Sequence, residues 1–329
     1  MKNILLFSGQ GSQYYGMGKG LYQQNAIFRQ EIQTLNSLIY RLSSIDICGE
    51  VFAEEKNIGD AFDQPLESSL AIYLFERALA KLVMHYCPID GIASSSMGIL
   101  AASATVDGLS DEANIRFILG MSSAYAREAP KGTMIAVLAN VESYHKSPIL
   151  KEYTQIAGIN FSESYIVSVL DDNLAVVEAN LREAGLIYQK LPVRYPYHST
   201  WLAPAKHYVL QALQSQDFAQ HSLQLPLYCA SQVKSTITQL TPEDYWQAFI
   251  CPMEHLSMVK QLEAVGPNHY IDCSPSGTLA NIFKYAAGKQ SQSIFTTLLS
   301  PFQSNPTAAI ENMVKITREN LTRSYRIAY

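Results

Sequence analysis

A serine-rich turn is the first place in the sequence where residue types and spacing could support covalent chemistry. The turn, Ser94-Ser95-Ser96-Met97-Gly98, follows a short apolar run at 89–93 and precedes a small-residue helical stretch at 99–106. A nucleophile elbow requires a hydroxyl at a sharp strand-to-helix turn, small neighbours, and N–H groups that can bind an oxyanion. Ser96, with Gly98 two residues later, fits this requirement, although Ser94 stands where glycine is usual. The alternatives are a plain serine-rich helix cap and Ser95 as the reacting hydroxyl.

A serine nucleophile requires a general base, and histidine is the usual base at neutral pH. Of the seven histidines in the chain, His198 stands out because Tyr195-Pro196-Tyr197-His198-Ser199 lies where one predicted domain returns to another. Domain junctions are favoured places for clefts. An ordinary histidine pKa of about 6.5 predicts activity that falls below that pH. A histidine of the core or the surface, without a catalytic role, is the alternative.

A glycine-containing loop follows the first apolar run of the chain, at 4–7. The loop, Gly9-Gln10-Gly11-Ser12-Gln13, lacks both the G-x-G-x-x-G spacing and the lysine of phosphate-binding loops, so nucleotide binding is weakly indicated. Such a loop can instead present a backbone N–H beside a neighbouring active site. A plain turn is the alternative.

The composition excludes several classes of protein. A chain of 329 residues suits two compact units, and 48% apolar residues exclude wholesale disorder. The net charge of -5 argues against nucleic acid as the main partner. We find neither a long uncharged apolar stretch nor a leader segment, so we expect no membrane span. The five cysteines have no CxxC spacing, which predicts reduced thiols in a cytoplasmic protein and no metal framework.

Short apolar runs alternate with helical patterns over most of the chain, which predicts an α/β fold with a parallel sheet. A long helix is predicted at 65–86 and a last strand at 270–273. One region differs, because it carries a βαββαβ pattern typical of ferredoxin-like units, with its elements at 134–138, 141–153, 155–160, 165–170, 173–183 and 187–193. We therefore predict a large α/β-hydrolase-like domain, formed by 1–132 and 197–329, and an inserted ferredoxin-like small domain at 133–196.

Together these motifs resemble the malonyl-CoA:acyl carrier protein transacylase family over almost the whole chain. The resemblance rests on segments that lie along the chain at 7–13, 94–98, 159–160, 191–198 and 272–279. It implies that Ser96 is the nucleophile and that His198 is the base, oriented by a backbone carbonyl. It also implies that the backbone N–H groups of Gln10 and Met97 form the oxyanion hole.

The departures from the family pattern concern the acyl pocket. Ser94 and Ser95 replace the Gly-His that precedes the family's serine, Ser69 replaces a glutamine, and Leu119 stands in the place of the malonyl-binding arginine. Arg116, one turn earlier, is the alternative guanidinium. Without a guanidinium, a malonyl carboxylate would be buried unpaired at a cost of several kcal/mol. We therefore predict an acyl pocket for uncharged groups, lined by Ser69, Ser95, Leu119, Asn160, Tyr195 and Tyr197.

This pattern resembles the acyltransferase homologues of trans-acyltransferase polyketide synthase clusters that act as acyl hydrolases, several of which have serine before the nucleophile. It implies an editing enzyme that removes stalled acyl groups from acyl carrier protein, without a metal or organic cofactor, and we expect a monomer. The alternatives are a transacylase that loads malonyl or another acyl unit, and a non-catalytic homologue that binds carrier protein. Carrier proteins are usually acidic around the phosphopantetheine, so Lys190, Arg194 and Lys206 are candidates for a docking patch, with solvated surface charge as the alternative.

Overall fold

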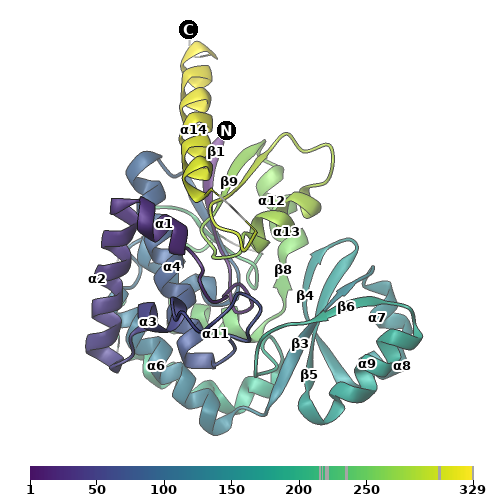
Figure 1. Ribbon diagram of the computed structural model, residues 1–329. Coiled ribbons are helices and arrows are strands. Elements are labelled where there is room, and N and C mark those ends of the chain that lie inside the picture. The colour runs from purple at the N-terminus through teal and green to yellow at the C-terminus, as the bar shows by residue number, and fades with distance from the viewer. Residues whose placement is uncertain (215, 217, 219–221, 234–235, 303–304, 328–329) are drawn as a thin grey trace.

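The computed structural model describes residues 1–214, 216, 218, 222–233, 236–302 and 305–327. His221 lies outside these residues. The chain forms two five-stranded sheets with helices packed around them (Figure 1). Within the described part, no helix is both long enough and apolar enough to cross a membrane.

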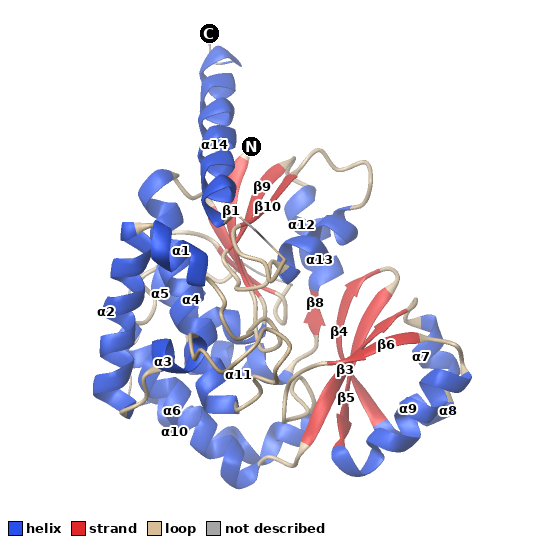
Figure 2. Cartoon of the chain, in the orientation of Figure 1, coloured by secondary structure: helices blue, strands red, loops and turns tan. Residues whose placement is uncertain are grey.

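The larger sheet is parallel throughout, with the strand order β10-β9-β1-β2-β7. Its strands are β1 (Lys2–Phe7), β2 (Gly91–Ser94), β7 (Leu227–Cys229), β9 (Asn268–Asp272) and β10 (Ile294–Thr297). The three central strands are almost fully buried because helices cover both faces of the sheet, as parallel sheets require (Figure 2). The predicted α/β architecture is thus confirmed, although β7 and β10, each only three or four residues long, were not predicted.

The helices around the larger sheet come mainly from the two ends of the chain. The helix predicted at 65–86 is confirmed with the same bounds, and it begins at Pro65, whose missing N–H costs nothing in the first turn. The helices are α1 (Lys19–Gln24), α2 (Ala26–Ser43), α3 (Ile47–Val51), α4 (Pro65–Tyr86), α5 (Ile99–Thr105), α6 (Asp111–Glu128), α10 (Lys206–Gln214), α11 (Pro242–Ile250), α12 (His255–Glu263), α13 (Thr278–Ala287) and α14 (Pro306–Ile327), with 3-10 turns η1 (Ser96–Gly98) and η3 (Thr200–Ala205).

The smaller sheet has the order β6-β3-β5-β4-β8. Its elements are β3 (Gly132–Leu138), α7 (Glu142–Lys146), α8 (Pro148–Tyr153), β4 (Thr154–Phe161), β5 (Ser164–Leu170), η2 (Asp171–Asn173), α9 (Leu174–Glu183), β6 (Ile187–Lys190) and β8 (Met253–Glu254). The first four strands of this order give the predicted ferredoxin-like arrangement, with antiparallel pairing. The single helix predicted at 141–153 is wrong, because Pro148 forces the preceding Ser147 into an extended conformation and divides the segment into α7 and α8.

The two sheets are joined by more than the chain connections at 132 and 190. Strand β8 comes from the C-terminal half of the sequence, yet it pairs in parallel with β4, with Gly158 opposite Met253 and Ile159 opposite Glu254. Directly after β8, helix α12 begins at His255. The C-terminal half of the chain therefore brings its own side chains to the inner edge of the smaller sheet.

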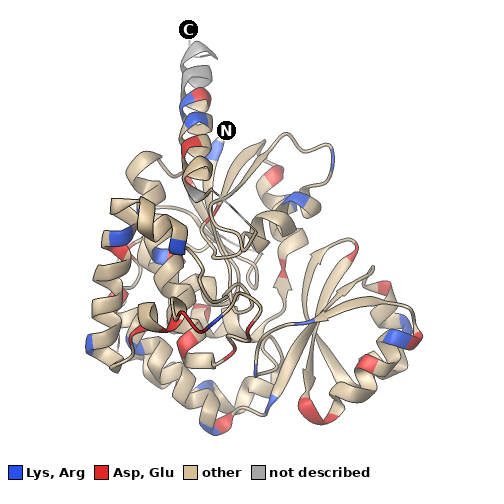
Figure 3. Cartoon of the chain, viewed as in Figure 1, with Lys and Arg blue, Asp and Glu red and all other residues tan. Residues whose placement is uncertain are grey.

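Charged residues are spread over the outer helices and loops (Figure 3). An acidic stretch follows α3, where Glu54, Glu55, Asp60 and Asp63 occur within ten residues. The strands of the larger sheet carry few charges, and the buried carboxyl groups there belong to Glu76 on α4 and Asp272 at the end of β9.

Candidate active site

Ser96 lies on a sharp turn at the carboxyl end of β2. The backbone N–H of Ser95 donates to the carbonyl of Phe7 at 2.9 Å, and Gly98 N–H donates back to Ser95 O at 3.0 Å. Ser96 itself has a left-handed backbone conformation, with φ of 53°. The chain thus changes from strand to helix within one residue, which is the backbone geometry of a nucleophile elbow.

Two glycines allow the backbone to approach this turn closely. A Cβ added at Gly98 would lie 2.4 Å from the carbonyl oxygens of both Phe7 and Ser8. A Cβ added at Gly9 would lie 2.7 Å from Ser96 Cβ and 3.2 Å from the backbone nitrogen of Met97. The loop that carries Gln10 is therefore packed directly against the elbow, which is where a second backbone N–H for an oxyanion is needed.

His198 is hydrogen-bonded to Ser96, with 2.8 Å between His198 Nε2 and Ser96 Oγ. Its Nδ1 lies 2.8 Å from the carbonyl oxygen of Cys251. Because a carbonyl oxygen only accepts, Nδ1 carries the proton, and Nε2 is free to accept the serine proton. Burial lowers the pKa of His198 to about 4, so the ring is neutral near pH 7 and can act as a base.

The segment that carries His198 is held by helix α11 and by the smaller sheet. The backbone N–H of His198 donates to the carbonyl of Phe249 on α11 at 3.1 Å. On the other side, the Ser168 hydroxyl on β5 donates to the carbonyl of Tyr197. The imidazole is thus positioned at the junction of the two sheets, with φ of 57° at His198.

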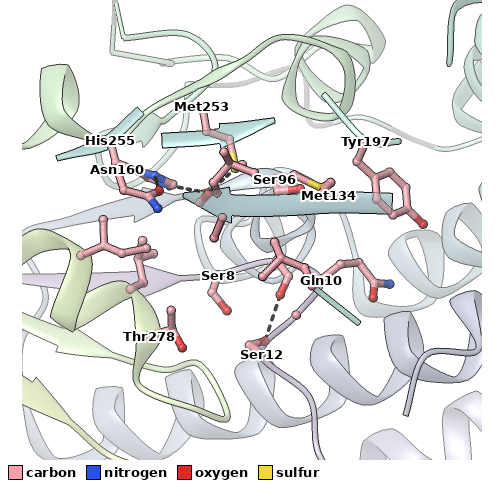
Figure 4. Close-up of a pocket in the computed structure, with 18 of the residues that line it drawn as sticks. Ser8, Gln10, Ser12, Ser96, Met134, Asn160, Tyr197, Met253, His255 and Thr278 are labelled. Atoms are coloured by element: carbon pink, nitrogen blue, oxygen red, sulfur yellow. Dashed lines mark hydrogen bonds between the residues drawn. The ribbon is translucent and has the colours of Figure 1, made fainter. Parts of the chain in front are cut away.

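A cavity of about 210 Å³ opens beside Ser96 and His198. Figure 4 shows Met253, His255 and Asn160 along one edge of the cavity and Ser8, Ser12 and Thr278 along the opposite edge. None of the described residues that line it is Lys, Arg, Asp or Glu. A neutral cavity next to an activated serine can hold an uncharged acyl group on the serine oxygen.

The sequence and the fold of the chain are similar to those of known proteins. Residues 4–324 match the sequence profile of the family described as acyl transferase domain. The chain belongs to the acyl transferase family. It is 30% identical over 302 residues to the polyketide biosynthesis acyltransferase homolog PksD of Bacillus subtilis, covering 91% of this chain and 92% of that protein. It is 29% identical over 307 residues to the homolog BaeD of Bacillus velezensis, covering 92% and 93%.

Solved acyl transferase structures share the fold. A loading acyltransferase from the avermectin modular polyketide synthase gives a TM-score of 0.82 at 17% identity, covering 95% of this chain and 99% of that one. The malonyl CoA-acyl carrier protein transacylase of Coxiella burnetii gives 0.79 at 18% identity, covering 96% and 97%. The resemblance of the sequence to this family, and to the acyltransferase homologues of polyketide clusters, is confirmed.

In this acyl transferase-family chain, Leu119 does not line the cavity, and the prediction that it does was wrong. Leu119 is half-buried on α6, and the α6 residue that borders Ser96 is Met121, in a small cavity of about 10 Å³ shared with Phe249. Two residues correspond to about 200° around a helix, so Leu119 and Met121 face nearly opposite directions. Arg116 is exposed and binds Glu112 through two nitrogens, at 2.8 and 3.1 Å, so it does not supply a guanidinium to the site.

The two predicted tyrosines take different positions. Tyr197 borders both cavities next to Ser96. Tyr195 borders neither and corrects the prediction, because its ring packs against Tyr125 and its hydroxyl accepts a hydrogen bond from Lys131 at 3.3 Å.

The remaining predicted residues lie at the site. Ser95 and Asn160 line the larger cavity, and Ser69 borders the smaller one. The Ser69 hydroxyl accepts a hydrogen bond of 2.6 Å from the Gln10 side chain. Gln10 also borders both cavities, and Met97 borders the smaller one.

Three residues that were not predicted from the sequence also border these cavities, namely His255, Met253 and Met121. His255 is buried at the start of α12, with its Nε2 2.7 Å from Ser95 Oγ. No motif surrounds it, and only the pairing of β8 with β4 carries it to the site. The sequence did contain a signal for Met121. Residues 119 and 121 of a helix cannot lie on the same face, so Leu119 and Met121 could not both border the cavity.

Of the three basic residues predicted for docking, Lys190 and Arg194 lie together and Lys206 lies apart from them. Lys190 and Arg194 line a second cavity of about 540 Å³ together with Lys131. Leu191 borders both this second cavity and the cavity of about 210 Å³ beside Ser96, which we call the acyl cavity. Arg194 is paired with Asp63 at 2.9 Å. Lys206 is paired with Glu243 on the surface at 3.1 Å and does not line this cavity.

Proposed function

We propose that this chain is an acyl-thioester hydrolase that removes acyl groups from acyl carrier proteins through an acyl-Ser96 intermediate. The relatives PksD and BaeD are named as polyketide biosynthesis acyltransferase homologues, and this supports a role in polyketide biosynthesis, where the hydrolase would edit carrier proteins.

The first half of the reaction uses the Ser96–His198 hydrogen bond. His198 Nε2 takes the hydroxyl proton as Ser96 Oγ attacks the thioester carbonyl carbon. The negative charge that forms on the carbonyl oxygen is stabilised by the backbone N–H groups of Gln10 and Met97. The proton then passes from His198 to the departing phosphopantetheine sulfur, which leaves as a thiol.

The observation that carries the proposal is the uncharged lining of the acyl cavity. A malonyl carboxylate buried there has no cation to pair with, which costs about 3 kcal/mol or more. Acetyl and other neutral acyl groups incur no such cost. The volume of about 210 Å³ exceeds that of engineered cavities that bind benzene, at about 150 Å³, so groups larger than acetyl also fit.

The carrier protein reaches the site through its phosphopantetheine arm. Lys131, Lys190 and Arg194 line the cavity that adjoins the acyl cavity, together with Asp63 and Asp171. Arg194 is paired with Asp63, so Lys131 and Lys190 are the residues whose charges suit the acidic surface of a carrier protein. Lys206 lies apart from this group and is not part of the proposed docking patch.

The test is to incubate the protein with acetyl-loaded and malonyl-loaded carrier protein and to follow both by intact-protein mass. We expect acetyl carrier protein to be returned as free thiol with release of acetic acid. We expect malonyl carrier protein to react roughly 100-fold more slowly, as about 3 kcal/mol implies.

Transacylation is the second candidate, because the fold is shared with a malonyl CoA-acyl carrier protein transacylase structure, and the Ser96–His198 hydrogen bond of this chain suits either reaction. It uses the same acyl-Ser96 intermediate and differs only in the acceptor. Rapid stoichiometric malonyl transfer from coenzyme A to carrier protein, with negligible hydrolysis of acetyl carrier protein, would establish this candidate and exclude the hydrolase.

A further inference from the structure

A second serine–histidine pair adjoins the first. Ser95 Oγ lies 2.7 Å from His255 Nε2, and His255 Nδ1 lies 3.0 Å from Asn160 Oδ1. These three residues line the same cavity as Ser96 and His198. They come from three distant segments, directly after β2, on β4 and at the start of α12. The acylation step described above uses none of them.

The hydrogen bonds in this group have a defined direction. The Asn160 side-chain nitrogen donates to Ser164 Oγ at 3.2 Å, which places Asn160 Oδ1 toward His255. An amide oxygen only accepts, so His255 Nδ1 carries a proton. Burial, together with repulsion from His198, lowers the pKa of His255 to about 3, so the ring is neutral and its Nε2 has a free lone pair.

This lone pair fixes the hydroxyl of Ser95. Ser95 Oγ also lies 3.2 Å from the thioether sulfur of Met253, but sulfur is a weak acceptor, so the proton of Ser95 points to the imidazole nitrogen. The remaining lone pairs of Ser95 Oγ are available to the cavity. Next to the nucleophile, the cavity therefore presents a hydrogen-bond acceptor held in place by His255 and Asn160.

We propose that Ser95, held by His255 and Asn160, orients the water that hydrolyses the acyl-Ser96 ester. This inference rests on the proposed hydrolase function. The water donates one hydrogen to Ser95 Oγ and the other to His198 Nε2, and its oxygen attacks the ester carbonyl carbon. His198 takes the second proton and passes it to Ser96 Oγ as the bond between Ser96 Oγ and the acyl carbon breaks. The products are a carboxylic acid and the free Ser96 hydroxyl, and Ser95 and His255 keep their protons.

Such an arrangement favours water over a thiol as the acceptor of the acyl group. Water has two hydrogens, and both find acceptors here, whereas a thiol has one hydrogen, for which His198 suffices. Ser95 therefore acts on the reacting water directly, and His255 and Asn160 act as positioning residues through Ser95. Their loss should slow hydrolysis more than transfer to a thiol.

The test compares three rates in the full chain, namely formation of acyl-Ser96 from acetyl carrier protein, its decay in water, and its decay with added phosphopantetheine thiol. For Ser95→Ala and Asn160→Leu, we expect the ratio of hydrolysis to thiol transfer to fall roughly tenfold or more, because a misplaced reactant can cost up to about 100-fold in rate. Asn160→Asp keeps an acceptor facing His255 and should restore the ratio to within about threefold of wild type. Ser103→Ala, which changes a buried, hydrogen-bonded serine of α5 outside the cavity, is the matched control and should leave the ratio unchanged.

Two results with Ser95→Ala would overturn this inference and leave the proposed hydrolase function standing. One is a wild-type ratio of hydrolysis to thiol transfer, and the other is a parallel fall of all three rates, as a structural defect predicts. Loss of the acyl adduct in Ser95→Ala but not in Ser96→Ala would also overturn it, because Ser95 would then be the nucleophile. A wild-type acyl-enzyme that releases no acid and reacts only with thiol would overturn the proposed hydrolase function, and this inference with it.

Discussion

Ser96 and His198 are hydrogen-bonded at 2.8 Å while both have left-handed backbone conformations, with φ of 53° and 57°. Among the described residues, only Ser44 and Asp107 are further non-glycine positions with positive φ. Left-handed conformations cost residues with a Cβ free energy and persist where surrounding contacts enforce them, often at functional sites. Here the enforcing contacts are the carbonyls of Phe7 and Phe249, which accept hydrogen bonds from the backbone N–H groups of Ser95 and His198, respectively.

Replacing Ser96 with alanine should abolish the acyl adduct and lower turnover by several orders of magnitude, because the serine and histidine act as a unit. His198→Ala should be about as severe, and the double variant little worse than either. Intact-protein mass detects the adduct, and release of free carrier-protein thiol gives turnover. A His198→Ala enzyme within tenfold of wild type would place the base elsewhere.

The pH profile should differ from that of an ordinary histidine. A base must be neutral to act, and burial lowers the pKa of His198 to about 4, so the neutral form persists well below the ordinary pKa of about 6.5. We expect kcat/KM to remain nearly constant from pH 7 to 5 and to fall as the pH approaches about 4. Initial rates measured after brief dilution into each buffer would check this. A midpoint near pH 6.5 would mean that the ring is solvated in the free enzyme.

Acyl preference should respond to Met121 and not to Leu119. Met121 borders Ser96, whereas Leu119 lies on another side of α6, so Met121→Arg can offer a guanidinium to a malonyl carboxylate and Leu119→Arg cannot. We expect Met121→Arg to shift the ratio of malonyl to acetyl turnover toward malonyl by roughly tenfold, the effect of about 1.4 kcal/mol. Leu119→Arg serves as the matched control and should leave this ratio within about threefold. An equal shift in both variants would contradict the described orientation of α6.

The elbow should not tolerate a side chain at Gly98. An alanine Cβ there would lie 2.4 Å from two backbone carbonyl oxygens, which cannot move without shifting β1. We expect Gly98→Ala to lower the free energy of unfolding by about 1–3 kcal/mol and to impair acylation. At Gly59 a Cβ meets nothing within 4 Å, so Gly59→Ala is the control. Urea unfolding of both variants measures the difference, and equal stability would show that the elbow relaxes.

Local sequence patterns predicted the elements whose formation depends on residues close together in the chain. The helix at 65–86 follows from apolar spacing and an N-terminal proline. The turn at Ser96 follows from small residues between an apolar run and a helix, and the ferredoxin-like order follows from alternating strand and helix patterns. Each of these signals lies within one contiguous stretch of chain.

Tertiary structure decided which side chains meet at Ser96. His255 is 160 residues from Ser95 along the chain, and the two are in contact because β8 pairs with β4 and brings the start of α12 to the cavity. Strand β8 has only two residues, which is too short to show the alternating hydrophobic pattern by which strands are predicted from sequence. The orientation of α6 was likewise decided by packing. Met121 lines a small cavity together with Ser96, Tyr197 and Phe249, and Leu119 does not. The sequence by itself therefore determined the turn at Ser96 and the architecture that carries it, whereas the lining of the cavity beside Ser96 depended on long-range contacts that no local pattern encodes.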